Sequence, residues 1–269
     1  MKSPAPISSP EEYLDLVGKF NRKGSLSNNY LQSSFPKLIE DKELFKIEGE
    51  NNLFILQKKD GFYRLYYTIN DTAEILRLPD GPLTTEIIFR KSARVSGVET
   101  DYLKKLGLKE HLIRDQYSGI YNKLHKPSPL HSGIRIYKTS ELEDASWAFG
   151  LFNEVFDRLT GDYVSPEDYS EIMEKGDLIL AEKDGILAGA LHQTIISNVA
   201  WISHVAVGKE ARGQQIGRLL VDYFVENNRV SDKSRYMLWV QNQNAPAVNM
   251  YLKKGFVPTG KSSLSMIKL

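Results

Sequence analysis

The chain has 269 residues, of which 41% are hydrophobic and 26% charged, and its 35 Lys and Arg residues nearly balance its 34 Asp and Glu residues. This composition is typical of a soluble globular protein, and the charge balance argues against a broad basic surface for nucleic acid or an anionic membrane. The absence of cysteine excludes disulfides, thiolate metal sites and a cysteine nucleophile.

The sequence shows neither a targeting signal nor a membrane anchor. Residues Met1 to Glu12 include Pro and Ser but no apolar run. No stretch elsewhere approaches the roughly 20 apolar residues of a spanning helix. We therefore expect a cytoplasmic protein that uses no metal and binds no membrane.

Strand-like runs alternate with amphipathic stretches along the chain, which indicates an α/β protein with a mixed sheet. A length of 269 residues favours two domains. Turn-forming residues gather between Lys126 and Gly133, so we predict a linker there. The predicted domains are residues 1–126 and residues 133–269.

The first domain contains a predicted hairpin. Two strand-like runs, Leu53 to Gln57 and Phe62 to Ile69, flank Lys59-Asp60-Gly61, and Asp-Gly supplies the positive φ angles of a tight turn. Farther along the same domain lies Leu103-Lys104-Lys105-Leu106-Gly107-Leu108.

The second domain is predicted to run strand, helix, polar loop around Gly161-Asp162, helix, hairpin around Lys183-Asp184-Gly185, and buried strand. In order, the helices and strands are Ile134 to Tyr137, Leu142 to Arg158, Pro166 to Glu174, Leu178 to Ala181 with Leu187 to Ile196, and Val199 to Val207.

The two domains share landmarks at different spacings. The Lys-Asp-Gly turn recurs, and Tyr251-Leu252-Lys253-Lys254-Gly255-Phe256 is similar to residues 103–108. Asp60 to Leu103 spans 43 positions and Asp184 to Tyr251 spans 67, so the first copy is 24 positions shorter. A tandem duplication is one hypothesis, and two unrelated folding units are the other.

The 24 extra positions contain the most informative segment. After Val205-Ala206-Val207, a turn containing Gly213 leads into a helix whose buried face is marked by Ile216, Leu219, Leu220, Tyr223 and Phe224. Free backbone N–H groups and the positive end of the helix dipole suit an anionic phosphate group, and Arg212 and Arg218 add positive charge. Taken alone, the pattern also fits a plain strand-to-helix connection.

Two motifs resemble the GNAT superfamily of acyl-coenzyme A-dependent N-acyltransferases. Val205 to Gly217, with its Arg212-Gly213-Gln214-Gln215-Ile216-Gly217 turn, is similar to the acyl-CoA signature of that family. Asn244 to Phe256 is similar to the downstream Asn-x-x-Ala-x-x-x-Tyr-x-x-x-Gly-Phe. The sequence departs from the signature at Gln215, where glycine is usual, and a positive φ there would strain the backbone.

The resemblance implies the GNAT fold, acetyl-CoA as co-substrate and a set of binding residues. The backbone of Val205, Ala206 and Val207 would bind the pantetheine arm. The N–H groups of the following turn would bind the pyrophosphate, which involves Arg212, Gly213, Gln214, Gln215, Ile216, Gly217 and Arg218. Asn244 fits a helix N-cap, with Pro246 in the first turn, and the resemblance adds a contact with the cofactor.

Tyr251 and His204 are the catalytic candidates. The resemblance implies that Tyr251 donates a proton to the leaving thiolate, a transfer that is uphill by about 2 kcal/mol because a thiol titrates near 8.5 and a phenol near 10. Periodicity alone would make Tyr251 a core aromatic residue. His204 lies in the strand before the cofactor turn, where it could accept the proton of the substrate or simply be a hydrogen-bonded strand histidine.

The predicted reaction is direct acetylation of a primary amine of a small molecule or peptide, because no Ser/His/acid arrangement for a covalent intermediate is visible. The loop from Asp157 to Tyr163 carries two acids that could hold an ammonium group. A homodimer is left open, and no nucleic acid is expected. The alternatives are an acyl-CoA sensor without turnover and a tandem enzyme like the aminoacyl-tRNA-dependent peptidyltransferases.

The first domain resembles a degenerate GNAT half without a cofactor site. No Arg-x-x-Gly-x-Gly pattern occurs between Leu53 and Tyr121. The match of residues 103–108 to the Tyr251 segment places Leu103, not Tyr102, at the position of the proton donor. We therefore expect this half to serve as a scaffold.

Overall fold

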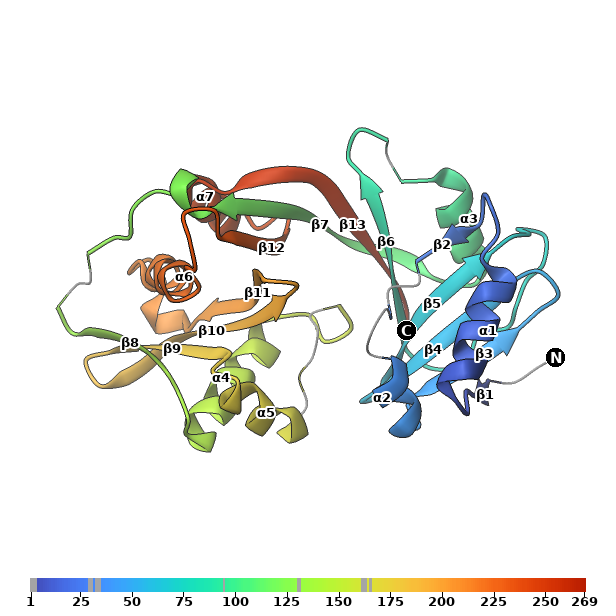
Figure 1. Cartoon of the computed structure of the whole chain (residues 1–269), viewed down its shortest axis with the longest axis horizontal. Helices are drawn as coiled ribbons and strands as arrows, with labels where there is room; N and C mark the ends of the chain where they lie inside the picture. The colour runs from blue at the N-terminus through green and yellow to red at the C-terminus, as the bar shows by residue number, and fades with distance from the viewer. Residues whose placement is uncertain are drawn as a thin grey trace. The chain divides into compact units, whose positions relative to one another are not determined.

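The computed structural model describes residues 4–28, 31, 35–93, 95–129, 132–160, 164 and 166–269 (Figure 1). The chain forms two compact units, Met1–Ile113 with Lys261–Leu269, and Arg114–Gly260. These units differ from the predicted domains, residues 1–126 and 133–269, because β7 (Lys109–Ile120) and β13 (Val257–Lys268) each begin in one unit and end in the other. Leu130 and His131 of the predicted linker lie outside the described residues.

The first unit has a mixed sheet whose strand order is β1-β3-β4-β5-β6, followed by residues 261–268 of β13. β5 and β6 are parallel, and the other pairs along this path are antiparallel. Besides its part of β7, the unit contains β1 (Ala5–Pro6), α1 (Pro10–Phe20), β2 (Leu26–Ser27), α2 (Phe35–Glu40), β3 (Leu44–Glu48), β4 (Leu53–Lys59), β5 (Phe62–Ile69), β6 (Leu83–Arg90) and α3 (Gly97–Lys105).

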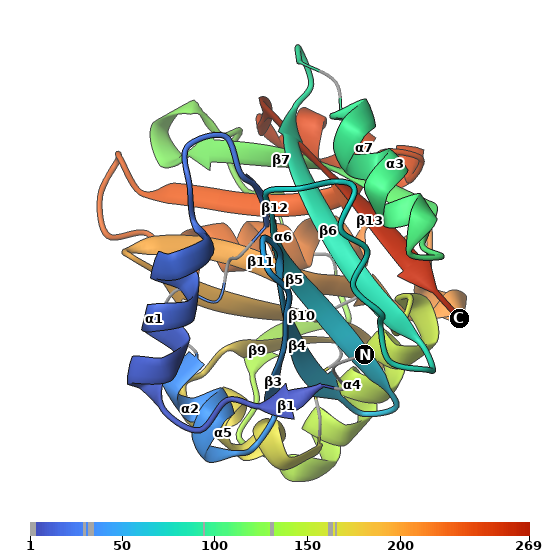
Figure 2. The same ribbon diagram turned by 90° about the vertical axis from the view of Figure 1, so that its right-hand side faces the viewer.

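Helices cover both faces of this sheet, because side chains of β4 alternate between them. Leu53 and Ile55 pack into the apolar cluster of α1. Phe54 and Leu56 pack into the cluster that contains Tyr102 of α3. Figure 2 shows α1 and α3 on either side of these strands.

The second unit has the strand order β7-β12-β11-β10-β9-β8, in which β11 and β12 are parallel. Its elements confirm the predicted strands and helices closely. They are the end of β7, η1 (Tyr121–Lys123), β8 (Ile134–Lys138), α4 (Leu142–Val155), η2 (Pro166–Asp168), α5 (Tyr169–Glu174), β9 (Leu178–Lys183), β10 (Ile186–Ile196), β11 (Val199–Val207), η3 (Lys209–Ala211), α6 (Ile216–Asn227), β12 (Arg235–Gln241), α7 (Ala245–Lys254) and the start of β13.

One helix ends earlier than predicted. α4 stops at Val155 rather than Arg158, because the Asp157 carboxylate accepts hydrogen bonds from the N–H groups of Leu159 (3.1 Å) and Thr160 (3.0 Å). A side chain that bonds the backbone ahead of it favours a turn over a further helical turn.

Two apolar clusters lie on opposite faces of the second sheet. Residues of α6 and α7, such as Leu220 and Tyr251, belong to one cluster. Residues of α4 and α5, such as Phe149 and Tyr169, belong to the other. In Figure 1, α6 lies on one side of β9 and β10, and α4 and α5 lie on the other.

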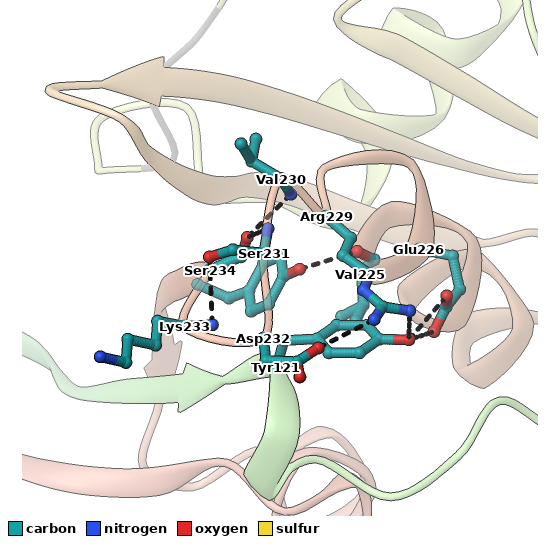
Figure 3. Close-up of polar contacts among 10 residues, drawn as sticks. Tyr121, Val225, Glu226, Arg229, Val230, Ser231, Asp232, Lys233 and Ser234 are labelled. Carbon is teal, nitrogen blue, oxygen red and sulfur yellow. Dashed lines mark hydrogen bonds and ion pairs between the residues drawn. The ribbon is translucent and has the colours of Figure 1, made fainter.

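A polar network fixes the connection from α6 to β12 (Figure 3). The Tyr121 hydroxyl lies 3.0 and 3.1 Å from the two carboxylate oxygens of Glu226. Arg229 Nη1 donates to the same hydroxyl oxygen at 3.0 Å, and its Nη2 pairs with Asp232 at 2.8 Å. The Arg229 guanidinium also lies over the Tyr121 ring, 4.1 Å from its centroid. The C-terminal end of α6 is thereby tied to the end of β7.

The two units repeat one order of elements. The first runs β1-α1-α2-β3-β4-β5-β6-α3-β7, apart from the short β2, and the second runs β8-α4-α5-β9-β10-β11-α6-β12-α7-β13. The difference is α6, since residues 70–82 between β5 and β6 form no helix. The shorter first copy therefore lacks the turn and helix that the cofactor signature occupies.

The Lys-Asp-Gly turns are not equivalent positions. One joins β4 to β5 in the first unit, and the other joins β9 to β10 in the second. β5 corresponds to β11, because each of them has a parallel neighbour in its unit. The first turn directly precedes β5, whereas the second precedes β10, which is one strand before β11. The repeat of these residues is thus a coincidence of turn chemistry within a duplicated fold.

Gly189 of β10 permits α6 to lie close to the sheet. A Cβ there would lie 2.9 Å from Ile216 Cγ2 and 3.0 Å from the Ala206 carbonyl oxygen. We expect Gly189→Ala to lower the free energy of unfolding by about 1–3 kcal/mol. Gly150→Ala on α4, where a Cβ meets no atom within 4 Å, should raise it by about 0.5–1 kcal/mol. Urea unfolding compares the two, and equal stabilities would contradict the close approach.

A buried carboxyl in the first unit makes stability depend on pH. Glu99 of α3 is 8% exposed and accepts a hydrogen bond of 2.5 Å from the Tyr67 hydroxyl. Burial raises the pKa of Glu99, so its contribution to stability is present at low pH and is lost as the pH rises through the folded-state pKa.

We expect Glu99→Gln, which keeps the acceptor, to be stabilised relative to the wild type more at pH 8 than at pH 4. Thermal unfolding of both proteins across this range measures the effect. A difference in melting temperature that does not change with pH would refute it.

Candidate functional site

β11 and β12 part near the middle of the second sheet. Their parallel pairing runs from Val199 opposite Arg235 to Ile202 opposite Leu238. From His204 to Val207, β11 keeps β10 as its pairing partner among the described strands. The edge of β11 that faces β12 therefore offers backbone N–H and C=O groups to an amide-bearing ligand.

A β-bulge at Ser203 changes which face the side chains of β11 occupy. His204 lies opposite His192, but Ile202 lies opposite Gln193, so Ser203 is the extra residue. Before the bulge, Ile202 packs into the cluster of α6 and α7. After it, Ala206 packs into the cluster of α4 and α5, and the alternate residues Val205 and Val207 pack against α6.

The turn after β11 contains two residues with positive φ. Gly213 has a φ of 78°, and Gln215, the N-cap of α6, has φ 65° and ψ 5°. The condition stated for Gln215 is met: the residue has a left-handed backbone, a conformation that costs a non-glycine residue about 1–2 kcal/mol. Strain of this kind persists where the surrounding structure requires the conformation.

The first turn of α6 has N–H groups that its N-cap does not satisfy. The Gln215 side chain makes no capping hydrogen bond, and no acidic residue lies in the first turn of this described helix. Ile216 is 1% exposed and anchors the turn in the core. Gly217 and Arg218 follow it, so the amides of this turn and the helix dipole point to where an anion could bind.

The polar side chains of the turn have partners of their own. Arg212 Nε donates to the Val207 carbonyl at 3.3 Å, which closes the turn onto the end of β11. Gln214 Nε2 donates to the Glu210 carbonyl at 3.0 Å, and Gln214 Oε1 accepts from Lys183. Arg212 and Arg218 are both exposed, as side chains that contact a phosphate group need to be.

The middle of α7 lies close to the start of α6. Asn244 caps α7, because its Oδ1 accepts from the Ala247 N–H at 3.2 Å, and a proline occupies the first turn. A Cβ at Gly217 would lie 3.5 Å from both Met250 Sδ and Val207 Cγ2. The end of β11, the start of α6 and the middle of α7 therefore converge at Gly217.

Tyr251 follows Met250 on α7 and is 3% exposed. Its ring packs edge-on against Phe256, with ring centroids 5.8 Å apart. Burial raises the pKa of the Tyr251 hydroxyl above its ordinary value. Leu252, the next residue of α7, is 45% exposed, so the buried face of the helix includes Tyr251 but not its neighbour.

His204 is buried at the bulge, 5% exposed. Its Nδ1 lies 3.3 Å from Nδ1 of His192, and the two rings stack with 9° between their planes. Phe152 and Phe156 of the α4 region contact the His204 ring at centroid distances of 5.2 and 5.1 Å. Sequence reasoning missed His192, because only the bulged register brings it opposite His204.

A buried ion pair joins the two helices of the site. Asp222 of α6 and Lys254 of α7 lie 2.5 Å apart, with side chains 5% and 4% exposed. Lys254 Nζ also donates to the His125 carbonyl at 2.7 Å, and the Ser128 N–H donates to Asp222 at 2.8 Å. Such a pair is costly to break from one side, so it holds α6, α7 and the preceding segment in register.

The acceptor loop predicted between Asp157 and Tyr163 is described only in part. The Asp157 carboxylate accepts from the backbone ahead of it and so closes the turn after α4. Gly161, Asp162 and Tyr163 lie outside the described residues.

The equivalent edge in the first unit is taken by the chain itself. β5 pairs with β6 only at Tyr63 and Arg64, and β2 pairs with the other end of β5, Leu26 opposite Ile69 and Ser27 opposite Thr68. The short β2 strand therefore occupies the place at which β5 and β6 part.

Asn28, which follows β2 and is 3% exposed, completes this closure. Its Oδ1 accepts from the Tyr67 N–H of β5 at 2.8 Å. Its Nδ2 donates to Thr85 Oγ1 at 2.7 Å and to the Glu86 carbonyl at 2.8 Å, both on β6. One amide side chain thus bridges the two parted strands.

Two features are absent from the described residues, a membrane-spanning helix and a metal-binding cluster. None of the helices there has the length and hydrophobicity of a membrane span. No group of three or more His, Asp or Glu side chains lies close enough together to hold a metal ion in the part of the chain that the structure describes.

Comparison with known proteins agrees with this geometry. The sequence pattern of the Acetyltransferase (GNAT) family matches residues 140–256. A Bacillus subtilis (strain 168) protein, provisionally named an alanine N-acetyltransferase of ribosomal protein bS18, is 31% identical over 125 residues, which are 46% of this chain and 81% of that protein.

Solved structures show the same fold. A GCN5-related N-acetyltransferase from Kribbella flavida has a TM-score of 0.59 at 15% identity, over 85% of this chain and 90% of its own. A tandem GNAT protein from the clavulanic acid biosynthesis pathway has a TM-score of 0.55 at 14% identity, over 98% of this chain and 89% of its own. The signature turn, the fold and the Bacillus relative agree: the chain belongs to the GNAT family of acetyltransferases and is an acyl-CoA-dependent N-acyltransferase.

Proposed function

We propose that the second unit transfers the acetyl group of acetyl-CoA directly to a primary amine. The observation that carries this proposal is the free edge of β11 from Ser203 to Val207, which leads into the uncapped first turn of α6. A strand edge suits the amides of a pantetheine arm, and the helix start suits a pyrophosphate.

The residues present fit this co-substrate. The backbone of Val205, Ala206 and Val207 would bind the pantetheine arm, and the amides of the turn up to Arg218 would bind the pyrophosphate. Arg212 and Arg218 add charge at the exposed side of the turn. We assign Asn244 to capping α7, and through α7 to positioning Tyr251.

In the proposed reaction, the amine nitrogen attacks the thioester carbonyl carbon. The new C–N bond forms as the C–S bond breaks, coenzyme A leaves as its thiolate, and the amine gives up one proton. His204 is the candidate acceptor of that proton. Tyr251 is better suited to donate a hydrogen bond to the thiolate than to transfer its proton, because burial raises its pKa and makes full transfer more uphill.

The acceptor belongs to the class of primary amines. The Bacillus relative is named for the alanine of a ribosomal protein, which favours a peptide amine over a small-molecule amine for this chain. We propose one cofactor site per chain, because β2 and Asn28 fill the corresponding edge of the first unit.

Titration calorimetry with acetyl-CoA tests the cofactor site. We expect one site per chain in the wild type and no measurable binding in Gly217→Asp, because a carboxylate at the first turn repels the pyrophosphate. Gly217→Ala is the matched control: its Cβ fits at 3.5 Å from its neighbours, so binding should weaken less. Two sites per chain, or normal binding by Gly217→Asp, would refute the assignment.

Tyr251→Phe tests the role of the hydroxyl. A hydrogen bond to the charged thiolate contributes about 1.5–3 kcal/mol, so kcat should fall roughly 10–100-fold while acetyl-CoA affinity stays within about 2-fold. Release of free thiol with a panel of amines and peptides measures turnover. Unchanged kcat with a raised KM would mark Tyr251 as a packing residue instead.

A further inference from the structure

Lys183, the last residue of β9, lies on the face of the second sheet that α6 covers. Ile179 and Ala181 of the same strand pack into the cluster of α6 and α7. Leu178 and Leu180 pack into the cluster of α4 and α5. Because side chains alternate along a strand, the side chain of Lys183 follows those of Ile179 and Ala181 onto the α6 face.

The end of β9 lies at the same end of the sheet as the turn before α6. β9 and β11 run in one direction, because each is antiparallel to β10. Gly189 of β10 lies opposite both Ala181 of β9 and Val207, the last residue of β11. The same glycine is the point at which Ile216 of α6 approaches the sheet. Lys183 follows Ala181 by two residues and therefore starts close to this turn.

The side chain of Lys183 reaches the turn. Its Nζ donates a hydrogen bond to Oε1 of Gln214, and Nε2 of Gln214 donates to the Glu210 carbonyl at 3.0 Å. Gln214 is two residues before Ile216, the first residue of α6. The Gln214 side chain thus holds an ammonium group at the turn that leads into α6.

The charge of Lys183 is not neutralised by a carboxylate. Lys183 is partly buried, and it forms no ion pair in the part of the chain that the structure describes. Of its sequence neighbours, Glu182 belongs to the other face by alternation, and Asp184 is exposed in the tight turn. An ammonium group has three N–H donors, and the neutral oxygen of Gln214 uses one of them. The others can donate to an anion.

We propose that Lys183 binds a phosphate group of coenzyme A. The inference rests on the proposed function, in which the amides of this turn bind the pyrophosphate. Those amides supply partial charges only, whereas coenzyme A carries a pyrophosphate and a 3′-phosphate. Arg212 and Arg218 are exposed, so solvent and salt screen their charges more than the charge of Lys183. Gln214 is then a positioning residue for the ammonium group.

Calorimetry with acetyl-CoA tests the charge. Lys183→Met keeps the apolar stem and removes the ammonium group, and we expect Kd to rise roughly 10-fold. Lys183→Arg keeps the charge, so Kd should change by less than about 3-fold. Lys233→Met is the matched control, because Lys233 is exposed before Arg235, which lies opposite the start of β11 at the other end of the sheet. There Kd should stay within about 2-fold.

Dephospho-CoA, which lacks the 3′-phosphate, identifies the group that Lys183 binds. If this group is the 3′-phosphate, Lys183→Met weakens the binding of coenzyme A and leaves that of dephospho-CoA unchanged. If it is the pyrophosphate, the binding of both weakens by the same factor. Equal affinities of the wild type and Lys183→Met for coenzyme A would overturn the proposal.

Turnover and stability separate this role from a structural one. A contact with the phosphate end of the coenzyme is made equally before and during the reaction, so Lys183→Met should raise KM for acetyl-CoA without lowering kcat. The melting temperature without ligand should match that of the wild type, because methionine retains the apolar part of the side chain. A lower melting temperature with an unchanged Kd would make Lys183 a structural link between β9 and the turn, and the proposal would fail.

A second measurement uses the wild type alone. An amine-reactive reagent labels accessible lysines, and mass spectrometry measures the extent at each one. Saturating coenzyme A, which has no acetyl group to transfer, should reduce the labelling of Lys183 several-fold and leave that of Lys233 unchanged. Equal labelling of Lys183 with and without coenzyme A would contradict the inference. Failure of the proposed function itself would show differently, as no acetyl-CoA binding and no thiol release by the wild type.

Discussion

The second unit is organised around the parting of β11 and β12. Backbone N–H and C=O groups inside a protein need partners, so two strands that separate within a sheet leave an edge that another group must satisfy. The bulge at Ser203 lies at this point and turns the following side chains by one position. Because of that turn, His204 meets the phenylalanines of α4, and Val205 and Val207 support α6.

The first unit meets the same constraint without a ligand. Its parallel pair, β5 and β6, also separates after a short contact. There the chain supplies its own strand, β2, and the Asn28 side chain satisfies groups on both sides. The edge of β5 is thus filled by the chain itself. The helix equivalent to α6, which would follow a phosphate turn, is absent between residues 70 and 82.

Local patterns in the sequence predicted much of this arrangement. Periodicity identified the buried face of α6, and the neighbours of Asn244 identified it as the cap of α7. The departure from the family signature at Gln215 coincides with a left-handed backbone. The Ser9-Pro10-Glu11-Glu12 run has the pattern of a helix start, and Ser9 does cap α1. This helix was not predicted from the sequence. These features depend on residues close together in the chain.

The features that escaped prediction depend on distant residues. His192 meets His204 only through a register that a bulge shifts, and Asp222 meets Lys254 only after two helices pack. A two-residue strand such as β2 has too short a pattern to detect. The division of the chain into its two compact units likewise depends on distant residues, since it follows from strands that continue from one unit into the next.

The membership of β13 in both units sets an order of events during synthesis. β6 pairs fully with β13 only when Ile267 can lie opposite Thr84, which is 183 positions earlier in the chain. A ribosome adding about 5–20 residues per second needs roughly 10–40 s to span that distance. Throughout this interval the nascent chain carries an open strand edge, the kind of surface on which chains aggregate. The first unit to be synthesised is therefore the last to have its sheet completed.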